Sequence, residues 1–161
     1  MSDGRRSVDG GCACAELRYR LEASPLFVHC CHCSWCQRET GSAFAVNALI
    51  ETSRIRLLAG RPDAVRTPSA SGKGQLVQRC PTCRVGVWSH YAGFGEVVAF
   101  VRAGTLDDPA AVSPDVHIYT STKLPWVNLP ADVPSFADYY VTREQWPAAS
   151  LERLKRLRHA D

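Results

Sequence analysis

The cysteines constrain this chain most, because all eight fall in three short clusters of its 161 residues. The clusters are Gly10-Gly-Cys12-Ala-Cys14, His29-Cys30-Cys31-His32-Cys33-Ser-Trp-Cys36 and Cys80-Pro-Thr-Cys83. Thiols one to three residues apart can reach one metal ion together, whereas scattered cysteines are more typical of disulfides. We therefore expect a fold organised around zinc.

The composition indicates where such a chain works. No run approaches the roughly 18 apolar residues of a membrane-spanning helix, and the first ten residues lack the apolar middle of a secretory signal. We expect a cytoplasmic protein that does not contact membranes, in a compartment where cysteines stay reduced. Its length and 45% apolar content predict a single domain over 1–161, with a core at about 8–140 and a tail at 141–161.

The charge balance does not favour nucleic acid as a partner. The formal net charge is +3. Four thiolates around a divalent ion leave about −2, and three leave about −1. Two zinc sites of these kinds would bring the net charge to about zero, so we expect no nucleic-acid binding.

Short alternating segments predict a mainly β fold. Leu17, Tyr19 and Leu21 alternate with arginines between Glu16 and Glu22, as in a half-buried strand. Similar strands are expected near Leu26–His29, Phe44–Leu49, Arg54–Leu58, Gln75–Arg79, Val85–Tyr91, Val97–Arg102 and Val116–Tyr119. The polar stretch Thr67–Gly74 is expected to be a loop. A short C-terminal helix capped by Ser150 is predicted from Leu151, Leu154 and Leu157, which share one helical face.

Two distant cysteine pairs predict one structural zinc site. Cys12 and Cys14 are one residue apart, and Cys80 and Cys83 have the two-residue gap of a zinc knuckle. Together these residues, the four-cysteine group, would complete a tetrahedral site with no position left for substrate. The alternatives are buried cysteines without a metal, or a redox dithiol at Cys80 and Cys83.

The middle cluster predicts a second zinc site. If Cys31 leaves a strand, Cys33 projects from the same side and Cys36 returns through a tight turn, while Cys30 and His32 point away. Cys31, Cys33 and Cys36, the three-cysteine group, would leave one zinc position open for a reactant. The alternative is a closed site completed by Cys30, His29, His32, His90 or His117. Cys30 itself is interpreted as a small buried residue, a fourth ligand or a reactive thiol.

The order of these motifs resembles the family of glutathione-dependent formaldehyde-activating enzymes. The resemblance runs from Gly10 through Cys36-Gln-Arg38-Glu-Thr-Gly41-Ser42 and Cys80–Cys83 to Pro114-Asp-Val-His117-Ile118 and Trp126. It implies a β-tent of small antiparallel sheets around two zinc ions, one structural on the four-cysteine group and one catalytic on the three-cysteine group. This chain has Ala15 and Arg84 where the family usually has glycine after a cysteine pair.

The resemblance also implies a reaction. The family's proposed chemistry joins formaldehyde and glutathione into S-hydroxymethylglutathione, or reverses this, which makes the expected protein a carbon-sulfur lyase. Its partners would be glutathione or another small thiol and an aldehyde. Arg38 would meet a glutathione carboxylate, and His117 and Trp126 would flank the pocket as proton carrier and ligand wall. The alternatives are a non-catalytic zinc module for a protein or nucleic-acid partner, and a thiol-based redox or metal sensor. The sequence does not predict an oligomeric state.

Overall fold

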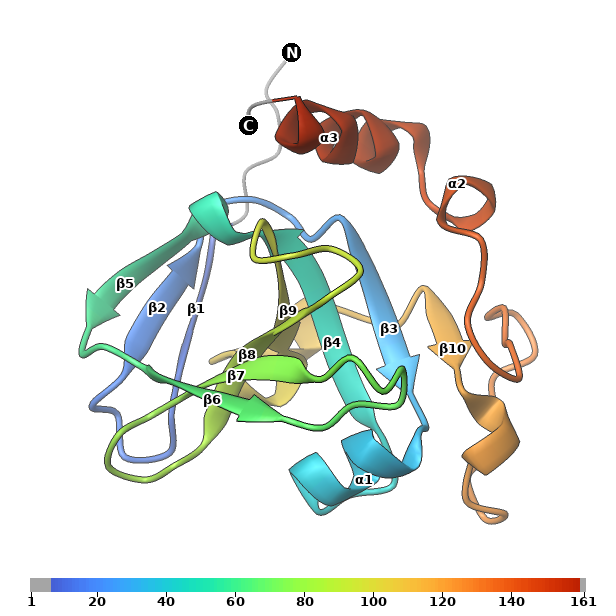
Figure 1. Ribbon diagram of the computed structural model, residues 1–161, viewed down its shortest axis with the longest axis horizontal. Coiled ribbons are helices and arrows are strands. Elements are labelled where there is room, and N and C mark those ends of the chain that lie inside the picture. Colours follow the sequence, from blue (N-terminus) through green and yellow to red (C-terminus); the bar gives the residue numbers. More distant parts are fainter. Residues whose placement is uncertain (1–6, 160–161) are drawn as a thin grey trace.

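In the described part of the chain, the fold is built from two β-sheets with three α-helices at their ends (Figure 1). The computed structural model describes residues 7–159. Within them, β1 (Val8–Gly11), β2 (Arg18–Leu21) and β5 (Ile55–Ala59) form an antiparallel sheet in the order β1-β2-β5.

The second sheet has seven strands in the order β10-β3-β4-β9-β8-β7-β6. These are β3 (Phe27–Cys31), β4 (Ala45–Glu51), β6 (Asp63–Thr67), β7 (Gln75–Arg79), β8 (Gly86–Tyr91), β9 (Val98–Arg102) and β10 (Val116–Ile118). Neighbours in this sheet pair antiparallel except β10, which lies parallel to β3. The parallel pair sets His117 beside Cys30 in the register.

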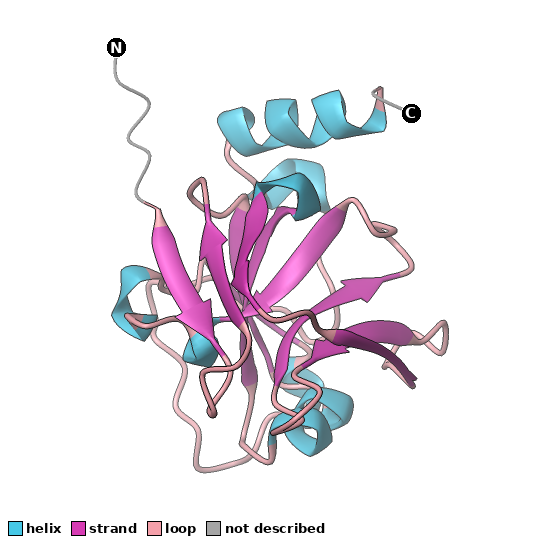
Figure 2. Ribbon diagram, turned by 90° about the vertical axis from the view of Figure 1, so that its left-hand side faces the viewer, coloured by secondary structure: helices cyan, strands magenta, loops and turns pink. Residues whose placement is uncertain are grey.

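The helices are α1 (Ser34–Thr40), α2 (Thr142–Gln145) and α3 (Ala148–Arg158). Figures 1 and 2 show α3 lying across one end of the strands and α1 at the opposite end, just beyond β3. No helix within residues 7–159 is both long and apolar enough to cross a membrane.

The central strands are buried on both faces, which explains why β3 and β9 are almost continuously apolar. One face carries Phe27, Leu49 and Phe100 in an apolar cluster that also contains the three-cysteine group. The other face carries residues such as Val28, Ile50 and Val101, packed against the β1-β2-β5 sheet. Period-two alternation thus places the two cores on opposite sides of one sheet.

The C-terminal segment closes the first of these clusters. Trp146 stacks on Phe27 with 5.6 Å between ring centroids, and Tyr140 and Leu154 are also buried there. Burying side chains of this size contributes roughly 1.5–3 kcal/mol each to the free energy of unfolding. The expected boundary between a core and a tail at residue 141 stays a prediction, but side chains from both parts share one cluster.

The prediction of a mainly β fold with a short C-terminal helix is confirmed, and each predicted strand has a counterpart within a few residues. One sheet is larger than expected. Strands β1 and β6 were not predicted: β6 is largely exposed at a sheet edge and has no apolar alternation. β1 contains Gly10, where a Cβ atom would lie 2.6 Å from the Tyr19 ring, so close packing on β2 requires glycine.

Two local predictions were wrong. Cys36 lies in a helix rather than a tight turn, because the Cys33 sulfur accepts a hydrogen bond from the Cys36 amide and caps α1. Ser150 does not cap the C-terminal helix, which begins two residues earlier behind Pro147 and leaves Ser150 buried inside it.

Candidate metal centres and an adjacent pocket

The four-cysteine group joins the turns of the two sheets. Cys12 and Cys14 lie between β1 and β2, and Cys80 and Cys83 lie between β7 and β8. The Cys14 sulfur lies 3.5 Å from the Cys12 sulfur and 3.7 Å from the Cys80 sulfur. All four sulfurs of the group are within 4.8 Å of one another. Sulfurs on a tetrahedral zinc are about 3.8 Å apart, since each Zn–S bond is about 2.3 Å. The donor set and its spacing therefore fit zinc.

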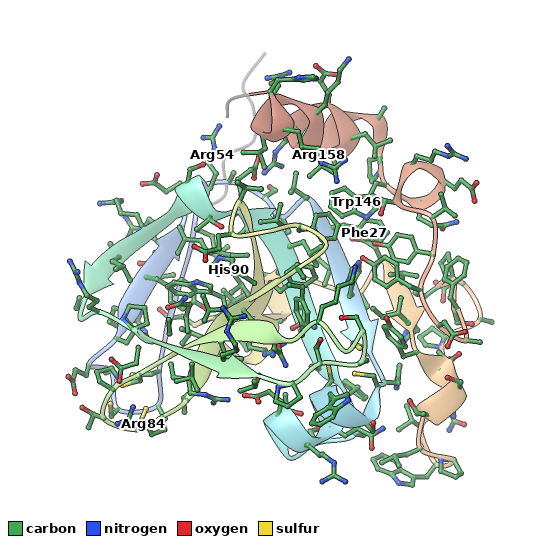
Figure 3. The ribbon with its side chains drawn as sticks, viewed as in Figure 1. Phe27, Arg54, Arg84, His90, Trp146 and Arg158 are labelled. Carbon is green, nitrogen blue, oxygen red and sulfur yellow. The ribbon has the colours of Figure 1, made fainter. Side chains whose placement is uncertain are left out.

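The backbone turns in a similar way after both cysteine pairs, although the first turn is one residue shorter. The Ala15 amide donates to the Cys12 carbonyl, and the Arg84 amide donates to the Cys80 carbonyl. Ala15 and Arg84 both have φ of 63°, in the left-handed region that favours glycine. Figure 3 shows Arg84 at the end of the molecule where this turn lies. The two departures from the family pattern therefore keep the geometry that glycine would adopt.

The three-cysteine group is assembled where β3 ends and α1 begins. Cys31 is the last residue of β3, Cys33 caps α1, and Cys36 lies in its first turn. Their sulfurs are within 4.8 Å of one another and all three residues are buried. Within residues 7–159, no fourth cysteine, histidine or carboxylate joins this group. A metal held here would keep a position for a reactant.

The thiols of this group cannot all ionise without a cation. Hydrogen bonds from Cys31 and then Cys36 lower the pKa of Cys33 to about 3. The bonds to Cys33 and Cys36, with burial, raise the pKa of Cys31. For Cys36 the bond with Cys31 lowers the pKa, but Cys33 and burial raise it to about 12. One thiolate is stable in the trio alone, and a divalent cation would stabilise three, so the chemistry of the site fits zinc.

Arg102 supplies fixed positive charge near the trio. This buried side chain of β9 lowers the pKa of Cys36 by its charge, although other effects outweigh it. Its Nη1 donates to the Asn47 side chain, which lies between Arg102 and the pocket described below. No local motif marks Arg102 in the sequence, because the groups on which it acts come from β4 and α1.

Cys30, His32 and His117 form a second buried cluster on the other side of β3, which we call the histidine cluster. The Cys30 sulfur lies 3.6 Å from His32 Nε2, which lies 2.9 Å from His117 Nδ1. Two nitrogens on a tetrahedral zinc would be about 3.3 Å apart. The shorter separation is typical of a hydrogen bond, so we interpret this cluster as a hydrogen-bonded network.

Backbone hydrogen bonds of His32 hold the loop that carries Cys33. The His32 amide donates to the Ile118 carbonyl, and the His32 carbonyl accepts from the side chains of Gln37 and Thr122. Cys30 and His32 do point away from the three-cysteine group, as expected. The fourth-ligand alternatives Cys30, His32 and His117 instead meet each other, and His29 is hydrogen-bonded to the Tyr140 hydroxyl.

A pocket opens directly on the three-cysteine group. Of the described residues, many aromatic and some neutral polar side chains line its wall, and no aspartate, glutamate, lysine or arginine does so. The lining residues are His29, Cys31, Cys33, Trp35, Cys36, Asn47, Ser69, Ala70, Ser71, Gln75, Tyr91, Ala92, Gly93, Phe94, Phe100, Ile118, Tyr119 and Tyr139. Burial lowers the pKa of His29 to about 3, so this histidine is neutral.

The three weaker site predictions do not fall on this wall. Arg38 is exposed on α1, Trp126 is 71% exposed, and His117 belongs to the histidine cluster. None of them lines the pocket. The aromatic residues that do so were missed, because they come from α1, β8, β9, the loops after β8 and β10 and the segment before α2, and share no sequence spacing. Their only local signal was that Tyr91 and Tyr119 end predicted strands.

Comparison with known proteins identifies the family. The model of the glutathione-dependent formaldehyde-activating enzyme family matches residues 7–122. A crystal structure of a protein from Rhodobacter sphaeroides is similar over 80% of this chain and 99% of that chain, with 18% identity and a TM-score of 0.46. No match was found among curated proteins. The family match covers both cysteine groups and most of the chain, and this protein therefore belongs to the glutathione-dependent formaldehyde-activating enzyme family.

Proposed function

We propose that this protein is a zinc enzyme of the carbon-sulfur lyase type, acting on the adduct of glutathione and an aldehyde. The observation that carries the proposal is the three-cysteine group, which has three converging sulfurs and opens on a pocket. The four-cysteine group would hold a second, structural zinc. Family membership supports glutathione and formaldehyde as reactants.

The reaction forms or breaks one carbon-sulfur bond without a change of oxidation state. In the forward direction the thiol sulfur adds to the aldehyde carbon, the carbonyl becomes a hydroxyl, and the thiol proton ends on that oxygen. A zinc ion on Cys31, Cys33 and Cys36 would supply Lewis acidity to a thiolate or to the carbonyl oxygen. The protein's own part is to orient the two reactants and exclude water.

The pocket wall contributes hydrogen-bond donors for this chemistry. Burial raises the pKa of Tyr91, Tyr119 and Tyr139, so their hydroxyls stay protonated at neutral pH. A phenol that stays protonated donates a hydrogen bond to a developing oxyanion rather than repelling it. Tyr119 and Tyr139 lie 6.3 Å apart by ring centroid, and both line the pocket.

The test is the rate of adduct exchange, measured by NMR with ¹³C-formaldehyde and glutathione near pH 6, where the uncatalysed reaction of the thiol is slow. We expect the zinc-loaded protein to accelerate exchange and Cys33→Ser to lose at least tenfold of that acceleration. Cys30→Ser is the matched control, since this neighbouring cysteine lies outside the three-cysteine group. A wild-type protein no faster than buffer containing zinc would overturn the proposal.

The alternatives have less support. A redox sensor needs an accessible thiol, and Cys30 is 2% exposed beside His32. A non-catalytic zinc module would have a closed second site. X-ray absorption would then show four sulfurs around every zinc.

A further inference from the structure

The pocket beside the three-cysteine group is larger and more apolar than formaldehyde needs. Six aromatic side chains line it: Trp35, Tyr91, Phe94, Phe100, Tyr119 and Tyr139. Formaldehyde carries no carbon substituent that could contact them. Contact between an apolar wall and an apolar group of a ligand is favourable, because both surfaces are then removed from water.

The same wall is poorly suited to the peptide part of glutathione. That molecule carries two carboxylates, and burying a carboxylate without a cation or several donors is unfavourable. Arg38 is outside the wall, and the Arg102 guanidinium is held behind Asn47 and lines a different cavity. The charged ends of glutathione would therefore remain at the open side of the pocket, in contact with water.

One polar group on the wall lacks a partner. The Gln75 side chain is 4% exposed, and its Nε2 donates to the Pro68 carbonyl. Its Oε1 is buried and accepts no hydrogen bond from the residues that the structure describes. The Gln75 amide therefore adds a polar but uncharged group to the wall.

We propose that the pocket receives the organic group of an aldehyde larger than formaldehyde, uncharged and aromatic or branched aliphatic. This inference rests on the proposed function and names its substrate class. The thiol sulfur adds to the aldehyde carbon, the carbonyl oxygen becomes the hydroxyl, and the thiol proton moves to that oxygen. The substituent of the aldehyde then lies among the aromatic rings.

Two matched small molecules test which ligands the wall binds, independently of catalysis. Benzyl alcohol mimics the aromatic group and the hydroxyl of an adduct, and 4-(hydroxymethyl)benzoate adds one carboxylate. Binding to the zinc-loaded protein is followed by ¹H–¹⁵N NMR. We expect benzyl alcohol to shift amides at residues 91–94 and to bind at least tenfold more tightly than the carboxylate. Equal affinities, or benzyl alcohol shifts confined to other parts of the molecule, would overturn the inference.

A variant that adds a cation sharpens the test. Ala92 is exposed on the wall, so Ala92→Lys is expected to fold and to shift the preference at least tenfold toward the carboxylate. Ala64→Lys is the control, because Ala64 is exposed on β6 and does not line the pocket. An unchanged preference in Ala92→Lys, or the same change in both variants, would contradict the assignment.

Rates separate this inference from the proposed function. With glutathione, we expect a larger acceleration over buffer for phenylacetaldehyde than for formaldehyde. Acceleration with formaldehyde but neither binding of benzyl alcohol nor acceleration with phenylacetaldehyde would overturn the inference and leave the proposed function. Binding of benzyl alcohol at residues 91–94, with no faster adduct formation for any aldehyde, would overturn the proposed function. The inference that the wall binds an uncharged organic group would then still stand.

Discussion

Ala15 and Arg84 occupy equivalent places in the two turns of the four-cysteine group and share a φ of 63°. Each follows the second cysteine of its pair, and its amide donates a hydrogen bond to the carbonyl of the first cysteine, over 3.3 Å for Ala15 and Cys12 and 3.1 Å for Arg84 and Cys80. A side chain in this conformation costs roughly 1–2 kcal/mol. The ring of sulfurs therefore holds two residues in a backbone region that they would otherwise avoid.

Replacing Arg84 by glycine should stabilise the zinc-loaded protein. The relief of strain exceeds the extra entropy of an unfolded glycine, so we expect Arg84→Gly to be more stable than Arg84→Ala by about 1 kcal/mol in urea unfolding. The alanine variant is the control because both variants lose the contact with Asp63, an exposed ion pair of little weight. A glycine variant less stable than the alanine variant would show that the turn is unstrained.

The two cysteine groups should differ in what their loss does. Cys80 is fully buried and its group joins the turns of both sheets, so Cys80→Ser should unfold the protein at room temperature. Cys31→Ser should stay folded and contain one zinc fewer than the two expected in the parent. Zinc content and circular dichroism measure both effects, with Cys30→Ser as the cysteine control. Equal damage from the Cys80 and Cys31 variants would refute this division.

The histidine cluster should control how firmly the three-cysteine group holds its metal. His32→Ala removes the hydrogen bond to His117 and loosens the loop before Cys33. We expect release of one zinc to a chelator to become about 10–100-fold faster, while the other zinc is released as in the parent. His90→Ala is the matched control, since this buried histidine bonds Thr52 instead. Identical release from both histidine variants would argue against the link.

The ion pair between Glu51 and Arg153 should dock α3 in a pH-dependent way. Arg153 donates two hydrogen bonds to this buried carboxylate. Burial raises the pKa of Glu51, but the Arg153 bonds outweigh it and hold the pKa below the usual value. The stabilisation is therefore full above a pH of about 4.5 and is lost as the pH falls through the folded-state pKa.

The measurement is urea unfolding of the parent and Arg153→Met. We expect the variant to be less stable by about 1–2 kcal/mol at pH 7, with the difference shrinking below pH 4.5. Comparing the two proteins at each pH cancels the loss of metal that acid causes in both. Arg156→Met is the control, because Arg156 pairs with the exposed Glu152 at 3.7 Å. A difference that grows on acidification would contradict the assignment.

Local spacing in the sequence was enough to sort seven cysteines into a pair of pairs and a triplet, and to predict a mainly β fold. Sulfurs one to three residues apart, such as Cys31 and Cys33, are brought together by the backbone of a single segment. Alternation in segments such as 16–22 likewise reports a strand with one buried face. These signals depend on neighbours in the chain, so the sequence alone carries them.

Tertiary structure alone decided what surrounds the triplet. The parallel pairing of β10 with β3 brings His117 to His32 across 85 residues of chain and turns it away from the pocket. The aromatic wall is gathered from segments that share no spacing, and the charge of Arg102 acts on Cys36 from β9. Such contacts depend on which strands pair and in what register, and long-range pairing leaves no periodic trace in the sequence. The sequence by itself thus determined the candidate ligands, and the packing of distant strands determined the pocket that they face.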